Sequence, residues 1–316
     1  MEPLEQLELF PAPESPQDSP GPKTLTFKST LHRAARAYHE HMHDQGLSEH
    51  TIRAFDSDLR ILSRYIGARK LIGDISSEML QGFLHYLEHE RGVPCKPKSL
   101  ARRLTTLKVF FGWLYESEAI VEDPAATLVH RSVRTPLPHV LSEESVLQLL
   151  GATAAWRHDP DNPDARPHLL MTLLLDTGIK KGECMRIALQ DLDTSRPKSA
   201  SLLIRYDSIR QRFKERKLRL SPQFCAVLPD YLSQYQPKAK LFECTARNLE
   251  YVLDACEKRA GLPARSVSFE NLRWTSALRD YQSGMDHDDL RRKLGLSHIS
   301  WAETVEKLRR LAAPAL

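Results

Sequence analysis

The segment from Arg205 to Arg219 is the most cationic part of the chain and the part best suited to bind an anion. Its basic residues are Arg205, Arg210, Arg212, Lys214, Arg216, Lys217 and Arg219. Apolar residues at 201–206 and 214–220 predict two strands joined across 207–213. Like charges on such a hairpin repel each other unless an anion faces them, so a phosphate backbone is the simplest partner. We therefore predict DNA contacts from Arg210, Arg212, Lys214, Arg216 and Lys217.

A further candidate for phosphate chemistry, Arg273, lies in the stretch from Ser266 to Leu308. Apolar residues recur there at helical spacing, at Leu272, Ala277, Leu278, Tyr281, Leu290 and Leu294. With Gly284 between the two groups, the pattern predicts two amphipathic helices. The first carries Arg273, and the second ends at Leu294-Gly295.

This stretch resembles the C-terminal motif of the tyrosine recombinase (phage integrase) family. In that motif H-x-L-R-H-(S/T)-x-A-(S/T) is followed by a turn, by L-G-H and by a nucleophilic tyrosine. The matching residues are Leu272-Arg273, Thr275, Ala277, Gly284-Met285-Asp286 and Leu294-Gly295. The segment LLMTLLLDTGIKKGECMRIALQDLD also resembles the family's first catalytic box, through Thr177-Gly178, Glu183, Ile187, Asp191 and Asp193. The segment KERKLRLSP resembles the family's hairpin strand.

The resemblance implies a metal-free and cofactor-free reaction, in which a phenol oxygen attacks a DNA phosphate. Arginines and histidines stabilise the growing charge, and a lysine protonates the leaving oxygen. Of the six aligned catalytic positions only Arg273 is retained. The substituted positions are Lys180, Gln211, Glu270, Leu296 and Val305, with Arg210 or Arg212 as alternatives to Gln211 for the hairpin lysine. The resemblance therefore implies a recombinase fold without its catalysis.

Two details of this degenerate site follow from the residues. Glu270 precedes Arg273 by three residues on one helical face, which predicts a Glu–Arg pair. Ser297, His298 and Thr304 lie near the position of the missing tyrosine and are the alternatives for a nucleophile.

The N-terminal half predicts a compact bundle of four helices. Ser29 or Thr30, Ser48, Ser76 or Ser77, and Ser99 are the expected caps. The phrases GLSEHTIRAFDSDLRIL, SLARRLTTLKVFFGWLYE and VEDPAATL resemble the family's N-terminal core-binding (SAM-like) domain, which forms half of a clamp around DNA. The resemblance implies DNA contacts from Lys96, Lys98, Arg102 and Arg103.

Length and composition fit two soluble domains. The chain has 316 residues, 41% hydrophobic and 27% charged, with a net charge of +4 that an acidic N-terminus keeps low. Five scattered cysteines without a C-x-x-C pair predict reduced thiols and no metal site. We expect an acidic, proline-rich tail over 1–24, a core-binding helical domain over 25–130, a linker over 131–141 and a recombinase-like domain over 142–316. The expected fold class is mainly α with a small antiparallel β-sheet.

Three functions fit these features. The first is a catalytically inactive DNA-binding protein that serves as an architectural or regulatory subunit in DNA recombination, integration or a mobile-element system. Its partners would be double-stranded DNA and other recombinase subunits, in a hetero- or homo-oligomer. The second is an active recombinase whose nucleophile is unrecognised or supplied by a partner, and the third is a protein scaffold that does not bind DNA. No apolar run is long enough to cross a bilayer, so we expect a cytoplasmic, nucleoid-associated protein.

Overall fold

The computed structural model of this protein describes residues 25–129 and 136–313, with the side chain of Arg210 left outside the description. Contacts divide the chain into two units, Met1–Thr135 and Pro136–Leu316. The boundary falls within the segment that the sequence predicts to be a linker. The expected N-terminal tail lies outside the described residues. Among the described residues, no helix is both long and apolar enough to cross a membrane.

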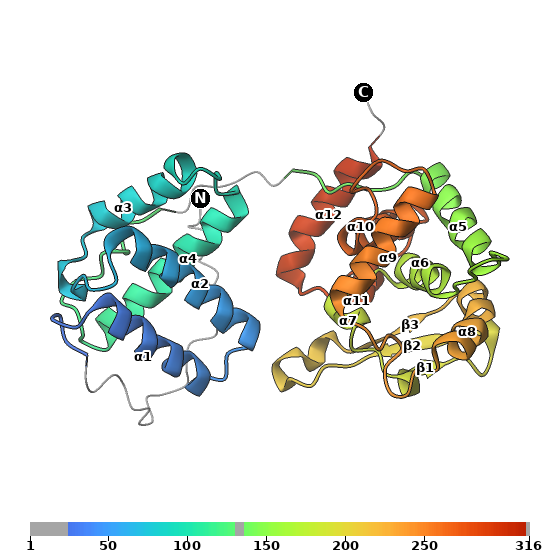
Figure 1. Ribbon diagram of the computed structural model, residues 1–316, viewed down its shortest axis with the longest axis horizontal. Coiled ribbons are helices and arrows are strands. Elements are labelled where there is room, and N and C mark those ends of the chain that lie inside the picture. The colour runs from blue at the N-terminus through green and yellow to red at the C-terminus, as the bar shows by residue number, and fades with distance from the viewer. Residues whose placement is uncertain (1–24, 130–135, 314–316) are drawn as a thin grey trace. The chain divides into compact units, whose positions relative to one another are not determined.

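The N-terminal unit is a helical bundle (Figure 1). Its elements are α1 Leu31–Asp44, α2 Glu49–Ile66, η1 Ile72–Asp74, α3 Ser77–His85, η2 Tyr86–Glu90 and α4 Pro97–Glu116. The side chains of Thr30, Ser48 and Ser76 accept hydrogen bonds from backbone amides and cap the first three α-helices, as the sequence predicts. The fourth begins two residues before the predicted cap at Ser99, because Pro97 already has the φ that a first helical turn requires.

Aromatic and leucine side chains fill the core of this unit. The largest fully buried side chains include Phe83, Phe110, Phe111, Leu59 and Leu62, from α2, α3 and α4. Burying each stabilises the folded unit by roughly 1.5 to 3 kcal/mol. The core therefore holds the helices together and leaves the basic residues of α4 at its edge.

The C-terminal unit is built around α6 (Figure 1). Its α-helices are α5 Glu143–Arg157, α6 Arg166–Thr177, α7 Lys181–Cys184, α8 Pro222–Tyr235, α9 Ala246–Arg259, α10 Phe269–Gln282, α11 His287–Lys293 and α12 His298–Ala312. Consecutive residues of α6 from Leu169 to Leu175 are buried. A helix that is apolar on every side must be surrounded, and α6 contacts α5, α8, α9 and α10.

Three short strands form the small antiparallel sheet that the sequence predicts. They are β1 Leu192–Asp193, β2 Ser201–Ile204 and β3 Arg216–Arg219. Each strand follows a short 3-10 helix: η3 Leu189–Asp191 precedes β1, η4 Pro197–Ser199 precedes β2, and η5 Ile209–Lys214 precedes β3. In the central pair Leu202 lies opposite Leu218 and Ile204 opposite Arg216. The hairpin therefore buries Leu202 and Leu218 and carries η5 at its end (Figure 1).

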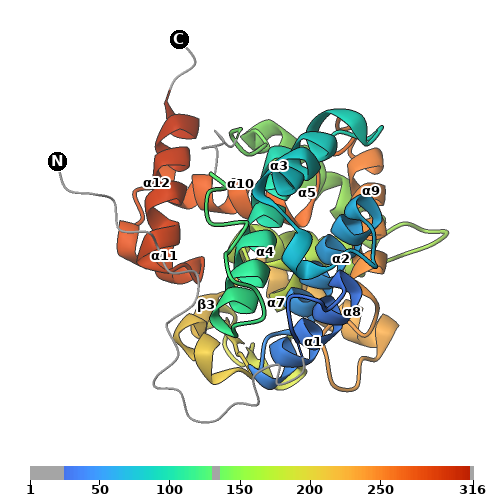
Figure 2. The same ribbon diagram turned by 90° about the vertical axis from the view of Figure 1, so that its left-hand side faces the viewer.

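The stretch around Arg273 folds into α10 and α11, separated at Gly284 as predicted. Gly284 has a φ of 83°, a conformation that glycine adopts without steric cost. Asp286 then caps α11 by accepting hydrogen bonds from two backbone amides. Figure 2 shows α12 beside α10 and α11, and Leu308 of α12 packs with Leu278 and Leu294.

Candidate nucleic-acid interface and the pocket beside it

Arg273 joins the ends of two other helices. One guanidinium nitrogen, Nη1, donates to the carbonyl of Gly178, and Nη2 donates to the carbonyl of Leu294 at 2.7 Å. Gly178 and Leu294 are the C-caps of α6 and α11, where backbone carbonyls lack partners within the helix. Burial lowers the pKa of Arg273 to about 10, opposed by the nearby Glu183 carboxylate. The guanidinium is therefore still charged at neutral pH and stabilises both helix ends.

The predicted pair between Glu270 and Arg273 is wrong. Glu270 lies in the first turn of α10 with an exposed side chain, whereas the Arg273 donors reach the two carbonyls named above. An exposed carboxylate is well solvated, and it gains little by leaving water for a half-buried guanidinium. Spacing along a helix permits such a pair, but the backbone carbonyls of Gly178 and Leu294 accept the hydrogen bonds of the Arg273 guanidinium instead.

Glu183 is the centre of the polar network next to Arg273. Its carboxylate accepts hydrogen bonds from both terminal nitrogens of Arg216, at 2.9 and 3.0 Å, and from the hydroxyl of Tyr206. The backbone amide of Lys180 donates to the same carboxylate at 2.8 Å. Burial alone would raise the pKa of Glu183, but these donors, above all Arg216, lower it to about 2. Burial, together with the contact to Glu183, raises the pKa of Tyr206 to about 12.

The prediction that Arg216 offers a free charge to DNA is wrong. Its side chain is only 8% exposed and forms a two-pronged pair with Glu183. Its Nε donates to the carbonyl of Lys293 at 2.7 Å, and a Cβ at Gly295 would lie 2.7 Å from its Nη1. Arg216 therefore ties β3 to α7 and to the end of α11, and Gly295 leaves it the necessary room.

Lys180 lies at the edge of a pocket of about 660 Å³ that also contains Arg273. Other charged residues that line this pocket are Lys181, Arg247, Arg265, Glu250, Asp254 and Glu270. Although part of the Lys180 side chain reaches the surface, burial of its amine lowers its pKa, and Arg273 lowers it further. The pocket thus keeps positive charge, mixed with carboxylates that would repel a phosphate.

The other positions that the resemblance marks as substituted lie on η5, in the loop between α11 and α12, and on α12. Gln211 is exposed on η5, Leu296 packs against the cluster around Leu290, and Val305 is half-buried on α12. Valine has neither a proton to give nor a lone pair to attack with. The position where the resemblance predicts the nucleophile therefore carries no reactive group.

Two of the three alternative nucleophiles near Val305, Ser297 and Thr304, form hydrogen bonds within α12 and its cap. The hydroxyl of Ser297 accepts from the amide of Ser300 and caps the helix. The hydroxyl of Thr304 donates to the carbonyl of Ser300 at 2.8 Å. His298 is exposed in the first turn of α12.

On the hairpin, the exposed cations are fewer than the sequence predicts. Arg212 and Lys217 are exposed and Lys214 is half-buried, whereas the side chain of Arg216 is only 8% exposed. Arg205 pairs with Asp191 at 2.7 Å. The side chain of Arg210 lies outside the described residues.

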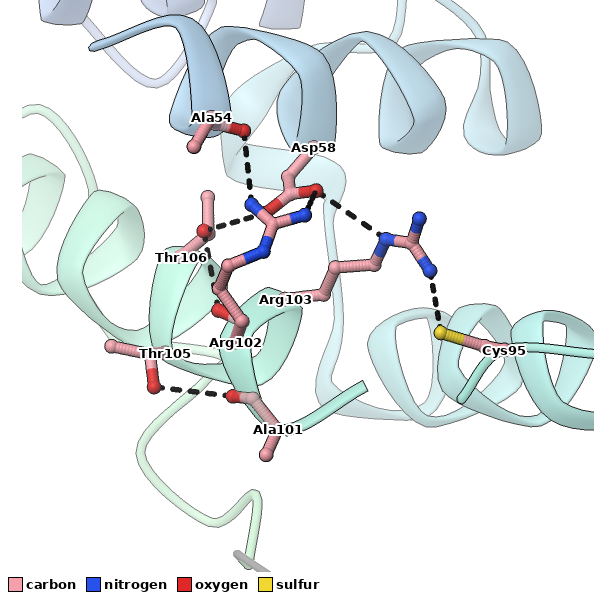
Figure 3. A network of polar contacts seen from close by, with 8 residues as sticks. All are labelled: Ala54, Asp58, Cys95, Ala101, Arg102, Arg103, Thr105 and Thr106. Atoms are coloured by element: carbon pink, nitrogen blue, oxygen red, sulfur yellow. Dashed lines mark hydrogen bonds and ion pairs between the residues drawn. The ribbon is translucent and has the colours of Figure 1, made fainter. Parts of the chain in front are cut away.

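In the N-terminal unit, the Asp58 carboxylate pairs with Arg102 and Arg103, the two arginines that we expected to contact DNA (Figure 3). The Arg102 guanidinium makes two hydrogen bonds to the Asp58 carboxylate, at 2.5 and 2.8 Å, and Arg103 makes one at 3.3 Å. Thr106 adds a fourth at 3.0 Å, and Asp58 is only 3% exposed. A buried carboxylate needs such partners.

The two arginines differ in what they leave for a ligand. Arg103 is 12% exposed and also reaches the sulfur of Cys95, so the prediction that it lies on an exposed basic face is wrong. Arg102 stays 44% exposed, and Lys96 and Lys98 are exposed. Sequence reasoning missed Asp58 as the partner of these arginines. The available signal was its position in the apolar stripe of α2, three residues after Phe55 and next to Leu59.

Comparisons with known proteins agree with this architecture. Residues 35–118 match the family model described as phage integrase, N-terminal SAM-like domain. The tyrosine recombinase XerC of Mycobacterium sp. (strain JLS) is 30% identical over 153 residues, which is 48% of this chain and 51% of the relative. The XerC of Staphylococcus saprophyticus is 26% identical over 273 residues, covering 81% of this chain and 86% of the relative. The match thus spans about half the length of the mycobacterial relatives and most of the staphylococcal one.

Solved structures share the fold. A lambda integrase dimer bound to a COC' core site superposes with a TM-score of 0.68 at 17% identity, covering 91% of this chain and 80% of the integrase. The XerH site-specific recombinase bound to a palindromic difH substrate gives 0.66 at 16% identity, covering 89% and 80%. These likenesses concern the arrangement of the helices and the sheet.

Proposed function

Because the chain belongs to the tyrosine recombinase (phage integrase) family, we propose that it binds double-stranded DNA without cutting it, as an architectural or regulatory subunit of a recombination, integration or mobile-element system. The observation that carries the proposal is Val305, which stands on α12 where the family has its nucleophile. Losing that phenol removes the covalent step itself, whereas losing one stabilising group would only slow it. Such a subunit acts with the DNA of the nucleoid, in the cytoplasm.

DNA contact is supported by the cations that remain available to a ligand. These are Arg212, Lys214 and Lys217 on the hairpin, and Lys96, Lys98 and the exposed part of Arg102 on α4. Ammonium groups on flexible stems bind phosphates as point charges and carry little sequence information. We therefore expect the DNA affinity of this protein to depend strongly on salt concentration and little on DNA sequence.

The loss of catalysis is further supported by the contacts of Arg273 and the residues around it. Arg273 donates to two backbone carbonyls, and the nearby Glu270 places a carboxylate on the pocket that a phosphate would enter. Lys180 keeps a charge but lacks the planar fork that grips two phosphate oxygens together. No single one of these groups decides the matter, but together they leave the transition state without its stabilising partners.

The experiment that tests the proposal is a search for covalent adducts. The protein is incubated with a nicked duplex library of random sequence, in which a cleaved strand cannot be rejoined, and denaturing gels then report any protein held on DNA. We expect gel-shift binding without adducts. An adduct mapped to any residue of this chain would establish the active alternative.

Similarity favours that active alternative. The match to the staphylococcal XerC covers most of both chains, and that relative is named a tyrosine recombinase. An active protein would need Ser297, His298, Thr304 or a group from a partner as its nucleophile. The adduct assay repeated in the presence of an intact recombinase separates these two sources, because peptide mapping identifies the chain that carries the phosphate.

Partner subunits form the last part of the proposal. The structural neighbours include a lambda integrase dimer on a core site and a lambda integrase tetramer on a Holliday junction. We propose that this chain likewise assembles on DNA, with copies of itself or with active recombinases. Light scattering of the protein with and without a duplex tests this, and complexes no larger than one protein per duplex would contradict it. A protein that assembled with recombinases but bound no duplex would instead be the scaffold.

A further inference from the structure

The 3-10 helix η5 lies between the strands of the hairpin (Figure 1), and two of its large apolar side chains are exposed. Phe213 is 67% exposed and Ile209 is 78% exposed. Single exposed apolar residues are ordinary on protein surfaces. These two lie in a cationic setting, because the residues between and after them include Arg212 and Lys214. A water-facing aromatic ring within a cationic segment is the combination found in proteins that stack on nucleic-acid bases.

The backbone that presents Phe213 is held in place at both ends. The amide of Tyr206 donates to the carboxylate of Glu215 at 2.9 Å, which closes the segment across its base. Within it, the amide of Glu215 donates to the carbonyl of Arg212 at 2.9 Å. The carbonyl of Lys214 accepts from Arg216 at 3.0 Å, and Arg216 is itself fixed by Glu183. The ring next to Lys214 is therefore projected from a fixed support, which lowers the entropy lost on binding.

Charge around the ring specifies which ligand would accept it. The ammonium of Lys214 lies 5.2 Å from the centre of the Phe213 ring, and Lys217 is exposed on the following strand. A phosphate that binds these lysines brings its base pairs within reach of the ring. An apolar protein surface would accept Phe213 but would desolvate the lysines without compensating them. The combination of ring and ammonium groups thus favours duplex DNA.

We propose that Phe213 is a wedge that enters between two base pairs and partly unstacks them. Wedges of Phe, Leu, Ile or Met are a known way to bend a duplex so that it covers more protein surface. The inference rests on the proposed DNA binding and gives the ring a role of its own, since the lysines hold the backbone while the ring deforms the stack. It also gives a non-cutting subunit a means to shape DNA.

The test compares two fluorescein-labelled duplexes of one sequence, one intact and one with a central abasic site. In the second duplex the stack is already broken, so a wedge enters without the cost of unstacking. We expect the wild-type protein to bind the abasic duplex about tenfold more tightly in anisotropy titrations, given the usual strength of base–aromatic stacking. Phe213→Ala removes this preference, and Phe213→Trp keeps it.

The chain offers a matched control at Phe27. This ring is 55% exposed in the N-terminal unit, and the ammonium of Lys28 lies 5.5 Å from its centre, so it resembles the Phe213–Lys214 pair. Phe27→Ala should leave the preference unchanged. An equal preference in the wild type and in Phe213→Ala would overturn the wedge while leaving DNA binding intact. Failure of the wild type to bind either duplex would overturn the proposed function and the wedge with it.

Discussion

Arg273, which the resemblance places in a catalytic motif, makes contacts that stabilise the fold. Its guanidinium satisfies the carbonyls of Gly178 and Leu294, which end α6 and α11. These contacts do not need a phosphate. The retained arginine therefore does not by itself indicate retained catalysis.

Replacing Arg273 with alanine should lower the free energy of unfolding more than it lowers DNA affinity. The change leaves two buried carbonyls without donors, which costs about 1 to 3 kcal/mol in comparable cases. Urea unfolding followed by circular dichroism measures the effect. Arg279→Ala is the matched control, since Arg279 lies on the same helix in an exposed pair with Glu143, and such pairs contribute about 0 to 1 kcal/mol. Equal losses in the two variants would contradict the assigned role.

Glu183 makes the free energy of unfolding depend on pH in the acidic range. Its pKa falls from the usual 4.5 to about 2 in the folded chain, chiefly through Arg216 in spite of burial. A carboxyl with a depressed folded pKa stabilises the folded state above its unfolded pKa, and this contribution is lost as pH falls through the folded value. The affected window therefore extends from about pH 5 down to about pH 2.

In this window Glu183→Gln should show a weaker dependence of the unfolding free energy on pH than the wild type. The variant is also less stable at pH 7, because Arg216 stays buried without its carboxylate. Urea midpoints at several pH values measure both effects. Glu144→Gln, at an exposed position in the first turn of α5, is the control and should follow the wild type. An unchanged slope in Glu183→Gln would show that other groups cause the acid sensitivity.

The helices and the hairpin were accessible from sequence because their signals are local. Ser48 and Ser76 cap helices where the pattern places them, and Gly284 separates α10 from α11. The partners of charged residues were not accessible in this way. Asp58 pairs with Arg102, which is 44 residues later in the sequence, and Glu183 pairs with Arg216, which is 33 residues later. Which cations remain exposed depends on these long-range pairs, so the sequence alone did not show that Arg103 and Arg216 are largely buried.

Because the Arg216 side chain is buried, the variant that tests DNA binding by the hairpin should change only Lys214 and Lys217. Lys214→Ala with Lys217→Ala should weaken binding to all duplex sequences alike and leave stability nearly unchanged, because neither ammonium is needed to pair a buried acid. Each lost phosphate contact should lower the slope of log affinity against log salt by roughly 0.9. Anisotropy titrations at several salt concentrations give this slope.

Arg196→Ala with Lys198→Ala is a control of equal charge from the segment before β2, where both side chains are exposed. We expect a smaller change in slope for this pair than for the hairpin pair. Equal slopes for the two double variants would mean that net charge, and not the hairpin, directs binding. The single change Arg216→Ala would not make this distinction, because it also breaks the network around Glu183.

At the scale of the whole molecule, the catalytic positions that the resemblance implies come from separate parts of the chain. Lys180 precedes α7, Gln211 lies on η5, Glu270 on α10 and Val305 on α12, with Leu296 just before that last helix. Catalysis requires all of them to act on one phosphate at once. A scaffold can keep its packing while each of these positions changes, because none of these side chains belongs to the fully buried core.

Val305→Tyr should therefore give no covalent adduct on the nicked duplex library. The phenol would return, but the positions that should neutralise the phosphate and protonate the leaving oxygen would still hold Gln211, Glu270 and Leu296. Adding Lys180→Arg, Gln211→Lys, Glu270→His and Leu296→His to Val305→Tyr supplies those groups, and only this combined variant is expected to yield adducts. The XerC of Staphylococcus saprophyticus serves as the comparison for the assay. Adducts from Val305→Tyr alone, mapped to the introduced phenol, would mean that the nucleophile is the only function the site has lost.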